Sequence, residues 1–124
     1  MYPVKDVYVT MPFGQRGSWA AGYHTGIDFR ASVGTPLYAT RGGTVVHKGW
    51  GGKGSAYGYH VVIRCLTRLG SRRQVIYAHM SSSPLYVGQK VKMGDYIGRS
   101  GDTGRTFGAH LHYEERRSPY GYYN

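Results

Sequence analysis

The chain has 124 residues, of which 40% are hydrophobic and 18% are charged, a composition typical of one globular domain and not of a disordered chain. Sixteen lysines and arginines face only six acids, and the net charge of +10 favours polyanionic partners: nucleic acid, anionic membrane or the acidic polymers of a bacterial wall. No window approaches the roughly 18 apolar residues of a membrane span. The first residues lack the pattern of a signal peptide, and the single cysteine, Cys65, lies in an apolar run that predicts a buried thiol.

Short apolar or alternating runs recur along the chain, and glycine-rich turns separate them. In chain order the expected strands are residues 7–10, 27–29, 36–39, 44–47, 59–66, 74–79, 87–91, 95–99 and 109–114. Residues 14–22 and 49–58 are expected to be loops, and residues 81–85 a brief helical turn. Strand 59–66 is expected to pair with strand 74–79. No stretch shows a sustained 3.6-residue apolar period, so the sequence predicts an all-β domain with antiparallel sheets in a sandwich or open barrel.

Four of the six histidines lie in contexts that suggest chemistry. In a strand, His110 and His112 would point to one face while Leu111 packs on the other. His24 and Asp28 are four residues apart, and the glycine between them argues against a helix. For each pair there is a plainer alternative, respectively two solvent-facing histidines at a sheet edge and a hydrogen-bonded pair in a turn.

The other histidines are weighed in the same way. His79 ends an apolar run at an expected strand terminus, and its plainer alternative is a capping or surface histidine. His47 and His60 lie within expected strands and are predicted to be structural or surface residues. Tyr57, Tyr59 and Tyr113 could line a groove, although wall or core packing is the favoured role of each.

Taken together, these residues suit a zinc site. Catalytic zinc takes three protein ligands and keeps one position for water. The chain offers His24, Asp28 and one of His110 or His112 as ligands, and spacing leaves that last choice open. Two histidines then remain, one to act as a base and one as a donor to an oxyanion.

Three ordered motifs resemble those of the lysostaphin/LytM-type zinc endopeptidases, which are peptidoglycan hydrolases. Residues 24–29 read HTGIDF, residues 77–80 read YAHM and residues 108–114 read GAHLHYE. The glycine-punctuated framework around them is also similar, so the resemblance covers about residues 10–116. Departures are small: Ala109, Met80 and Asp102 stand where proline, leucine and asparagine are common.

The resemblance implies a role for each motif residue. It makes His24, Asp28 and His112 the ligands of one Zn²⁺ per chain, and His79 and His110 the catalytic pair. Tyr23, next to a ligand, would help to bind the transition state, with plain packing as an equal alternative. The fold it implies is a single zinc endopeptidase catalytic domain over residues 1–124, with an active-site groove flanked by long loops.

The expected activity is hydrolysis of amide bonds in peptidoglycan stem peptides or cross-bridges at the bacterial cell wall. Both glycine bridges and D-alanyl–diaminopimelate cross-links are substrates in this family. The lack of a signal peptide favours a phage lysin, and with it the D-alanyl cross-link, over a piece of a secreted autolysin. A monomer is expected, with peptidoglycan as partner, anionic wall polymers attracted by general electrostatics, and neither nucleic acid nor a membrane span.

Three alternatives stay open at the level of sequence. One is an inactive zinc-containing module that binds or regulates at the wall. Another is a zinc amidase or carboxypeptidase acting on the same polymer. The last is a basic nucleic-acid-binding β-barrel, which fits the charge and the tyrosines but gives no reason for the histidine motifs.

Overall fold

The computed structural model describes residues 2–11, 26–51, 55–66, 70, 72–104, 106 and 108–117. The loop expected over residues 14–22 lies outside these ranges. Within them the chain forms nine strands and one 3₁₀ turn, with no α-helix and therefore no helix able to cross a membrane. The all-β prediction is confirmed.

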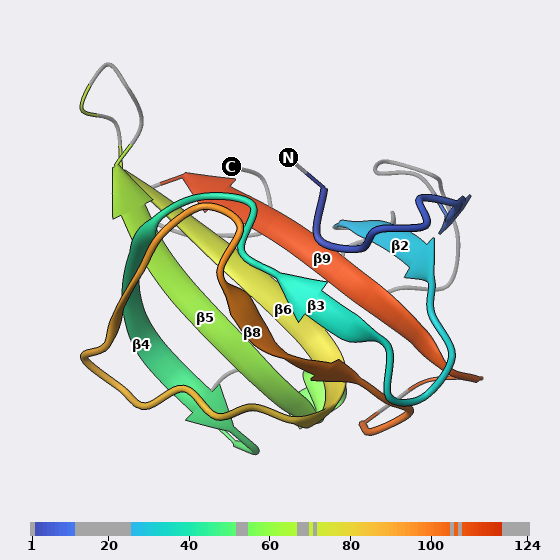
Figure 1. Cartoon of the computed structure of the whole chain (residues 1–124). Coiled ribbons are helices and arrows are strands. Elements are labelled where there is room, and N and C mark those ends of the chain that lie inside the picture. The colour runs from blue at the N-terminus through green and yellow to red at the C-terminus, as the bar shows by residue number, and fades with distance from the viewer. Residues whose placement is uncertain are drawn as a thin grey trace.

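The strands follow one another along the chain and are joined by turns and loops (Figure 1). They are β1 (Val9–Met11), β2 (Ile27–Arg30), β3 (Pro36–Tyr38), β4 (Gly43–Gly49), β5 (Tyr59–Leu66), β6 (Arg72–Ser82), β7 (Lys90–Val91), β8 (Tyr96–Ser100) and β9 (His110–Arg117), with the 3₁₀ turn η1 (Ser55–Tyr57) between β4 and β5. The expected pairing of β5 with β6 is confirmed, since Val61 lies opposite Tyr77 and Ile63 opposite Val75.

The longer layer has the strand order β1-β2-β9-β6-β5-β4-β7, and every pair in it is antiparallel. Strands β3 and β8 pair with each other and lie over one face of this layer (Figure 1). The main core fills the space between the layers: Leu37 and Ile97 come from β3 and β8, and Ile63, Tyr77 and Leu111 from the longer layer. The nine strands form one antiparallel sheet that folds over itself through β8 and β6, in agreement with the expected sandwich or open barrel. Cys65 is buried in this core, as predicted.

Strand β6 belongs to both layers, which explains an error in the sequence prediction. Residues 81–85 do not form a helical turn, because Ser81 and Ser82 extend β6 and Ser82 lies opposite Arg99 of β8. Ser83 then donates its hydroxyl hydrogen to the carbonyl oxygen of Ile97 over 2.6 Å. Pairing with a strand distant in sequence satisfies these backbone groups and overrides the local preference of serine for turns.

The face of the longer layer that points away from β3 and β8 carries the polar motifs. Phe29 and Leu111 point into the core, so their neighbours Asp28 and His112 point to the opposite face. A second, smaller apolar cluster of Val62, Ile76 and Ala78 lies apart from the main core. The candidate site is thus built on regular strands and not on loops alone, which fixes its side chains well.

Candidate active site

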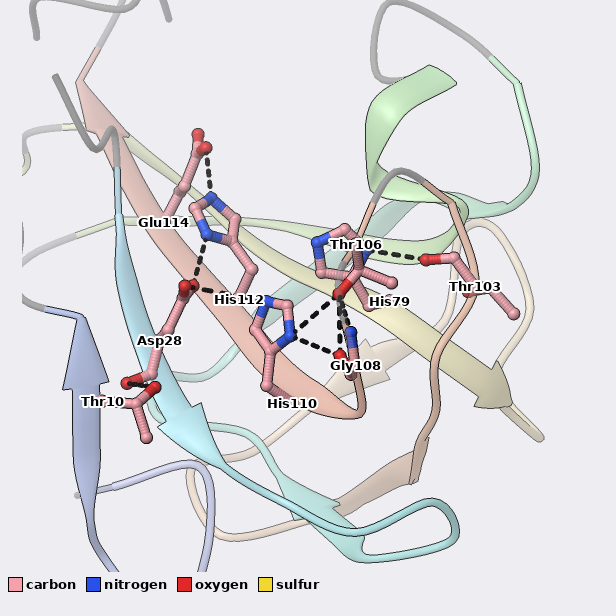
Figure 2. Close-up of polar contacts among 9 residues, drawn as sticks. All are labelled: Thr10, Asp28, His79, Thr103, Thr106, Gly108, His110, His112 and Glu114. Atoms are coloured by element: carbon pink, nitrogen blue, oxygen red, sulfur yellow. Dashed lines mark hydrogen bonds and ion pairs between the residues drawn. The ribbon is translucent and has the colours of Figure 1, made fainter. Parts of the chain in front are cut away.

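Asp28 and His112 lie directly opposite each other on β2 and β9. The Oδ1 atom of Asp28 is 2.8 Å from Nδ1 of His112, and the two side chains are only 15% and 9% exposed (Figure 2). An anionic oxygen and a ring nitrogen of opposite strands therefore point to one place. This donor pair fits a zinc ion, which accepts carboxylate oxygen and imidazole nitrogen together.

His110 lies on the same face as His112, as alternation along a strand predicts. Its Nδ1 is 2.9 Å from the carbonyl oxygen of Gly108. Because a carbonyl only accepts, Nδ1 carries a hydrogen, and in the neutral ring the lone pair is then on Nε2. That Nε2 atom is 3.6 Å from Oδ2 of Asp28, so the ring faces the same place as the Asp28–His112 pair.

His79 comes to this place from β6, where its φ of 59° is the only positive φ among the described non-glycine residues. The sequence predicted a strand terminus here, but β6 continues to Ser82, and His79 lies where β6 changes its partner strand from β9 to β8. Its ring centroid is 4.8 Å from that of His110 and 6.0 Å from that of His112. A left-handed backbone in a non-glycine residue costs about 1–3 kcal/mol and is often found at functional sites.

The His79 ring is neutral and fixed in one orientation. Its Nδ1 donates to the carbonyl oxygen of Thr103 over 2.7 Å, which leaves the lone pair on Nε2. Burial lowers its pKa to about 4, even though the hydrogen bond to Thr103 acts in the opposite direction. At neutral pH the ring can therefore accept a proton at Nε2.

The segment around Thr103, whose carbonyl oxygen accepts from His79, is itself held by hydrogen bonds and close packing. The Thr103 hydroxyl donates to the carbonyl oxygen of Met80 over 2.6 Å and accepts from the backbone N–H of Tyr59 over 3.0 Å. Gly58 packs so closely on Thr103 and Gly104 that a side chain at residue 58 would come within 2.4 Å of their backbone atoms. The Thr103 carbonyl is therefore a rigid acceptor for His79.

The sequence analysis missed a second polar layer behind His112. The Nε2 atom of His112 is 2.7 Å from Oε1 of Glu114, whose other oxygen is 2.7 Å from Nε of Arg116. Arg116 also donates to the hydroxyl of Tyr57, and the Tyr57 ring stacks on the His112 ring with centroids 5.8 Å apart. The signal was present in the sequence, because residues 110, 112, 114 and 116 of one strand must share a face.

The two carboxylates decide the charge of His112. Burial by itself lowers the pKa of this ring, but hydrogen bonds and charges from Asp28 and Glu114 outweigh it and raise the pKa to about 9. A cation bound at Nδ1 would take the place of the proton that Nδ1 shares with Asp28, so metal uptake would release a proton.

Other predicted residues lie outside or beside this cluster. His24 and Tyr23 are outside the described residues, and in the part of the chain that the structure does describe, no three His, Cys, Asp or Glu side chains are arranged to hold a metal ion. His47 and His60 stack on each other with centroids 4.3 Å apart, and burial lowers the pKa of His60. The structural or surface role predicted for these two histidines stays a prediction.

Comparison with known proteins matches this architecture to one family. A profile of Peptidase family M23 matches residues 22–121. The chain is 38% identical over 119 residues to the DD-carboxypeptidase/endopeptidase Mpg of Neisseria meningitidis serogroup B. The aligned region covers 92% of this chain and 25% of Mpg. The chain thus spans about a quarter of the length of this relative.

Two solved structures have the same fold. The catalytic domain of the antimicrobial peptidase lysostaphin from Staphylococcus simulans superposes with a TM-score of 0.81 at 29% identity, covering 94% of this chain and 85% of that domain. A zinc containing peptidase from Vibrio cholerae superposes with a TM-score of 0.79 at 30% identity, covering 94% of this chain and 36% of that protein. The resemblance found in the three sequence motifs is confirmed, and the chain belongs to Peptidase family M23.

Proposed function

We propose that this chain is a zinc-dependent endopeptidase that hydrolyses amide bonds in the stem peptides or cross-bridges of peptidoglycan. The observation that carries the proposal is the convergence of Asp28 Oδ1 and His112 Nδ1, 2.8 Å apart, beside the rings of His79 and His110. His24 is proposed as the third ligand, from the spacing of the motif that it shares with Asp28. Residues 1–124 are proposed to form one catalytic domain with one zinc ion.

The chemistry divides between the metal and the two remaining histidines. His24, Asp28 and His112 would hold the zinc ion, and the bound ion would supply a Lewis acid for the scissile carbonyl and lower the pKa of a water molecule. His79 and His110 each bond a backbone carbonyl through Nδ1 and so present Nε2 to the site. One ring takes the proton of the attacking water at Nε2 and returns it to the leaving amine, and the other, with its Nε2 protonated, donates a hydrogen bond to the tetrahedral oxyanion.

The proposed bond is the D-alanyl–diaminopimelate cross-link. The 38% identity to Mpg, a DD-carboxypeptidase/endopeptidase, supports this choice. The glycine bridge is the second candidate, because the fold is so similar to the catalytic domain of lysostaphin and both bonds are substrates in the family. Either bond places the chain's action at the bacterial cell wall.

The test is digestion of two purified peptidoglycans, one with pentaglycine bridges and one cross-linked directly through diaminopimelate. We expect new peptide termini by mass spectrometry, their loss after a chelator and their return with zinc. The product masses identify the bond.

His79→Ala should keep zinc bound yet lower kcat by about 10²–10⁴, as expected for the loss of proton transfer or oxyanion stabilisation.

Each of the other outcomes would require a different assignment of the site or of the function. Loss of zinc from His79→Ala would overturn the ligand assignment. Zinc binding without product from either wall would indicate an inactive wall-binding module. Neither zinc nor product would leave the basic nucleic-acid-binding β-barrel as the next hypothesis to test.

A further inference from the structure

Glu114 is a carboxylate with no exposed side-chain surface, on the same strand face as His112. A buried carboxylate needs strong partners, because removing its charge from water is costly. It has them on both oxygens: Oε1 lies 2.7 Å from Nε2 of His112, and Oε2 lies 2.7 Å from Nε and 2.6 Å from Nη2 of Arg116 (Figure 2 shows the contact with His112).

We propose that Glu114 is a positioning residue, which fixes the ring of His112 so that Nδ1 is the nitrogen left for the metal. This inference rests on the proposed function, in which His112 is a ligand. An ionised carboxylate only accepts hydrogen bonds, so Nε2 of His112 carries the hydrogen. The Nδ1 atom is then the one that meets Asp28, at 2.8 Å.

Packing supports the same orientation from two sides. Tyr57 stacks on the His112 ring, and its hydroxyl accepts a hydrogen bond from Arg116, which also holds Glu114. On another side Gly26 passes so close that an added Cβ would lie 2.7 Å from Cγ of Glu114 and 3.0 Å from Cε1 of His112. The chain of contacts from Tyr57 through Arg116 to Glu114 leaves the ring little room to turn.

The consequence is a prepared metal ligand. A histidine whose second nitrogen bonds a carboxylate is held in the correct tautomer and orientation, and loss of such a partner costs about 10–100-fold in metal affinity. Glu114→Gln is the direct test, since it keeps the shape of the side chain but replaces one acceptor oxygen with an NH2 donor, so the side chain can no longer accept from both His112 and Arg116. Glu115→Gln is the matched control: Glu115 is the next residue, points to the other face and pairs with Arg41 and Tyr113.

The measurement is the zinc dissociation constant of each metal-free protein, obtained by competition with a chelating dye, together with thermal unfolding before and after zinc. We expect Glu114→Gln to weaken zinc binding about 10–100-fold and Glu115→Gln to leave it unchanged. Equal affinities in the two variants would overturn the positioning role. A fall in the unfolding temperature of metal-free Glu114→Gln with unchanged zinc affinity would show a merely structural role and would also overturn it.

A second readout uses the unmodified protein and does not depend on the folding of a variant. In ¹⁵N–¹H spectra of the zinc-loaded wild type, we expect the His112 Nε2 to carry a hydrogen that exchanges slowly with water. A bare Nε2 would overturn the proposal. If the wild type binds no zinc at all, the proposed function fails first, so the two failures can be told apart.

Discussion

Gly26 is the residue through which the chain enters β2 and the candidate site. A Cβ added there would lie 2.3 Å from the carbonyl oxygen of Tyr113, closer than any backbone tolerates without moving. The sequence showed only that a glycine stands between His24 and Asp28 and argues against a helix. The close approach of this glycine to β9 came from the tertiary structure.

We therefore expect Gly26→Ala to destabilise the protein by about 1–3 kcal/mol, the usual cost of overpacking. Chemical denaturation measures this loss. Gly42→Ala is the control, because its added Cβ would have its nearest neighbour at 3.2 Å, the carbonyl oxygen of Val91, and a small shift relieves it. Equal losses in the two variants would contradict the explanation from close packing.

At the level of single residues, alternation along a strand was the reliable guide. It placed His110 and His112 on one face with Leu111 in the core, and the structure confirms this. Applied to the positions two and four residues after His112, the same rule would have placed Glu114 and Arg116 on this face. The positive φ of His79 had no such signal, because a non-glycine residue gives no local indication that its backbone will be left-handed.

At the level of elements, the bend of β6 and the loop around Thr103 position His79 together. The Thr103 hydroxyl bridges the carbonyl of Met80 and the N–H of Tyr59, while the Thr103 carbonyl accepts from His79. The histidine is therefore held by a contact between segments far apart in the chain. Sequence reasoning could assign the strands but could not assign this contact.

Thr103→Val tests this contact, since it keeps the shape of the side chain and removes both hydrogen bonds of the hydroxyl. We expect a loss of about 1–3 kcal/mol in the free energy of unfolding, because the carbonyl of Met80 and the N–H of Tyr59 lose this partner, and a lower kcat because the Thr103 carbonyl that orients His79 is no longer held in place. Thr44→Val, on β4 and away from this loop, should change neither quantity. A stable Thr103→Val enzyme with full activity would contradict the positioning of His79 by the loop.

At the level of the whole molecule, the excess of basic over acidic side chains determines the charge of the surface. Sixteen lysines and arginines face six acids, and Asp28, Glu114 and Glu115 are already paired with His112, Arg116 and Arg41. Few carboxylates remain to balance the exposed basic side chains. A protein of this charge is attracted to anionic polymers over long range, and dissolved salt screens the attraction.

We expect His79→Ala, which keeps the net charge, to sediment with bacterial walls that carry anionic polymers. Binding should weaken strongly as salt rises from about 0.05 to about 0.5 M, because the screening length falls several-fold. Walls stripped of those polymers are the control and should bind less of the variant at low salt. Binding that ignores both salt and stripping would contradict general electrostatic attraction.

The sequence by itself determined the all-β class, most of the strands and the resemblance to lysostaphin/LytM-type endopeptidases, because period-two alternation, glycine-rich turns and three short motifs each lie within a few consecutive residues. Tertiary structure alone decided that β6 passes between two layers, that His79 bends towards His110 and that Glu114, Arg116 and Tyr57 stand behind His112. The physical reason is that these features depend on partners distant in the chain. Register and packing bring such partners together, and no window of sequence contains them.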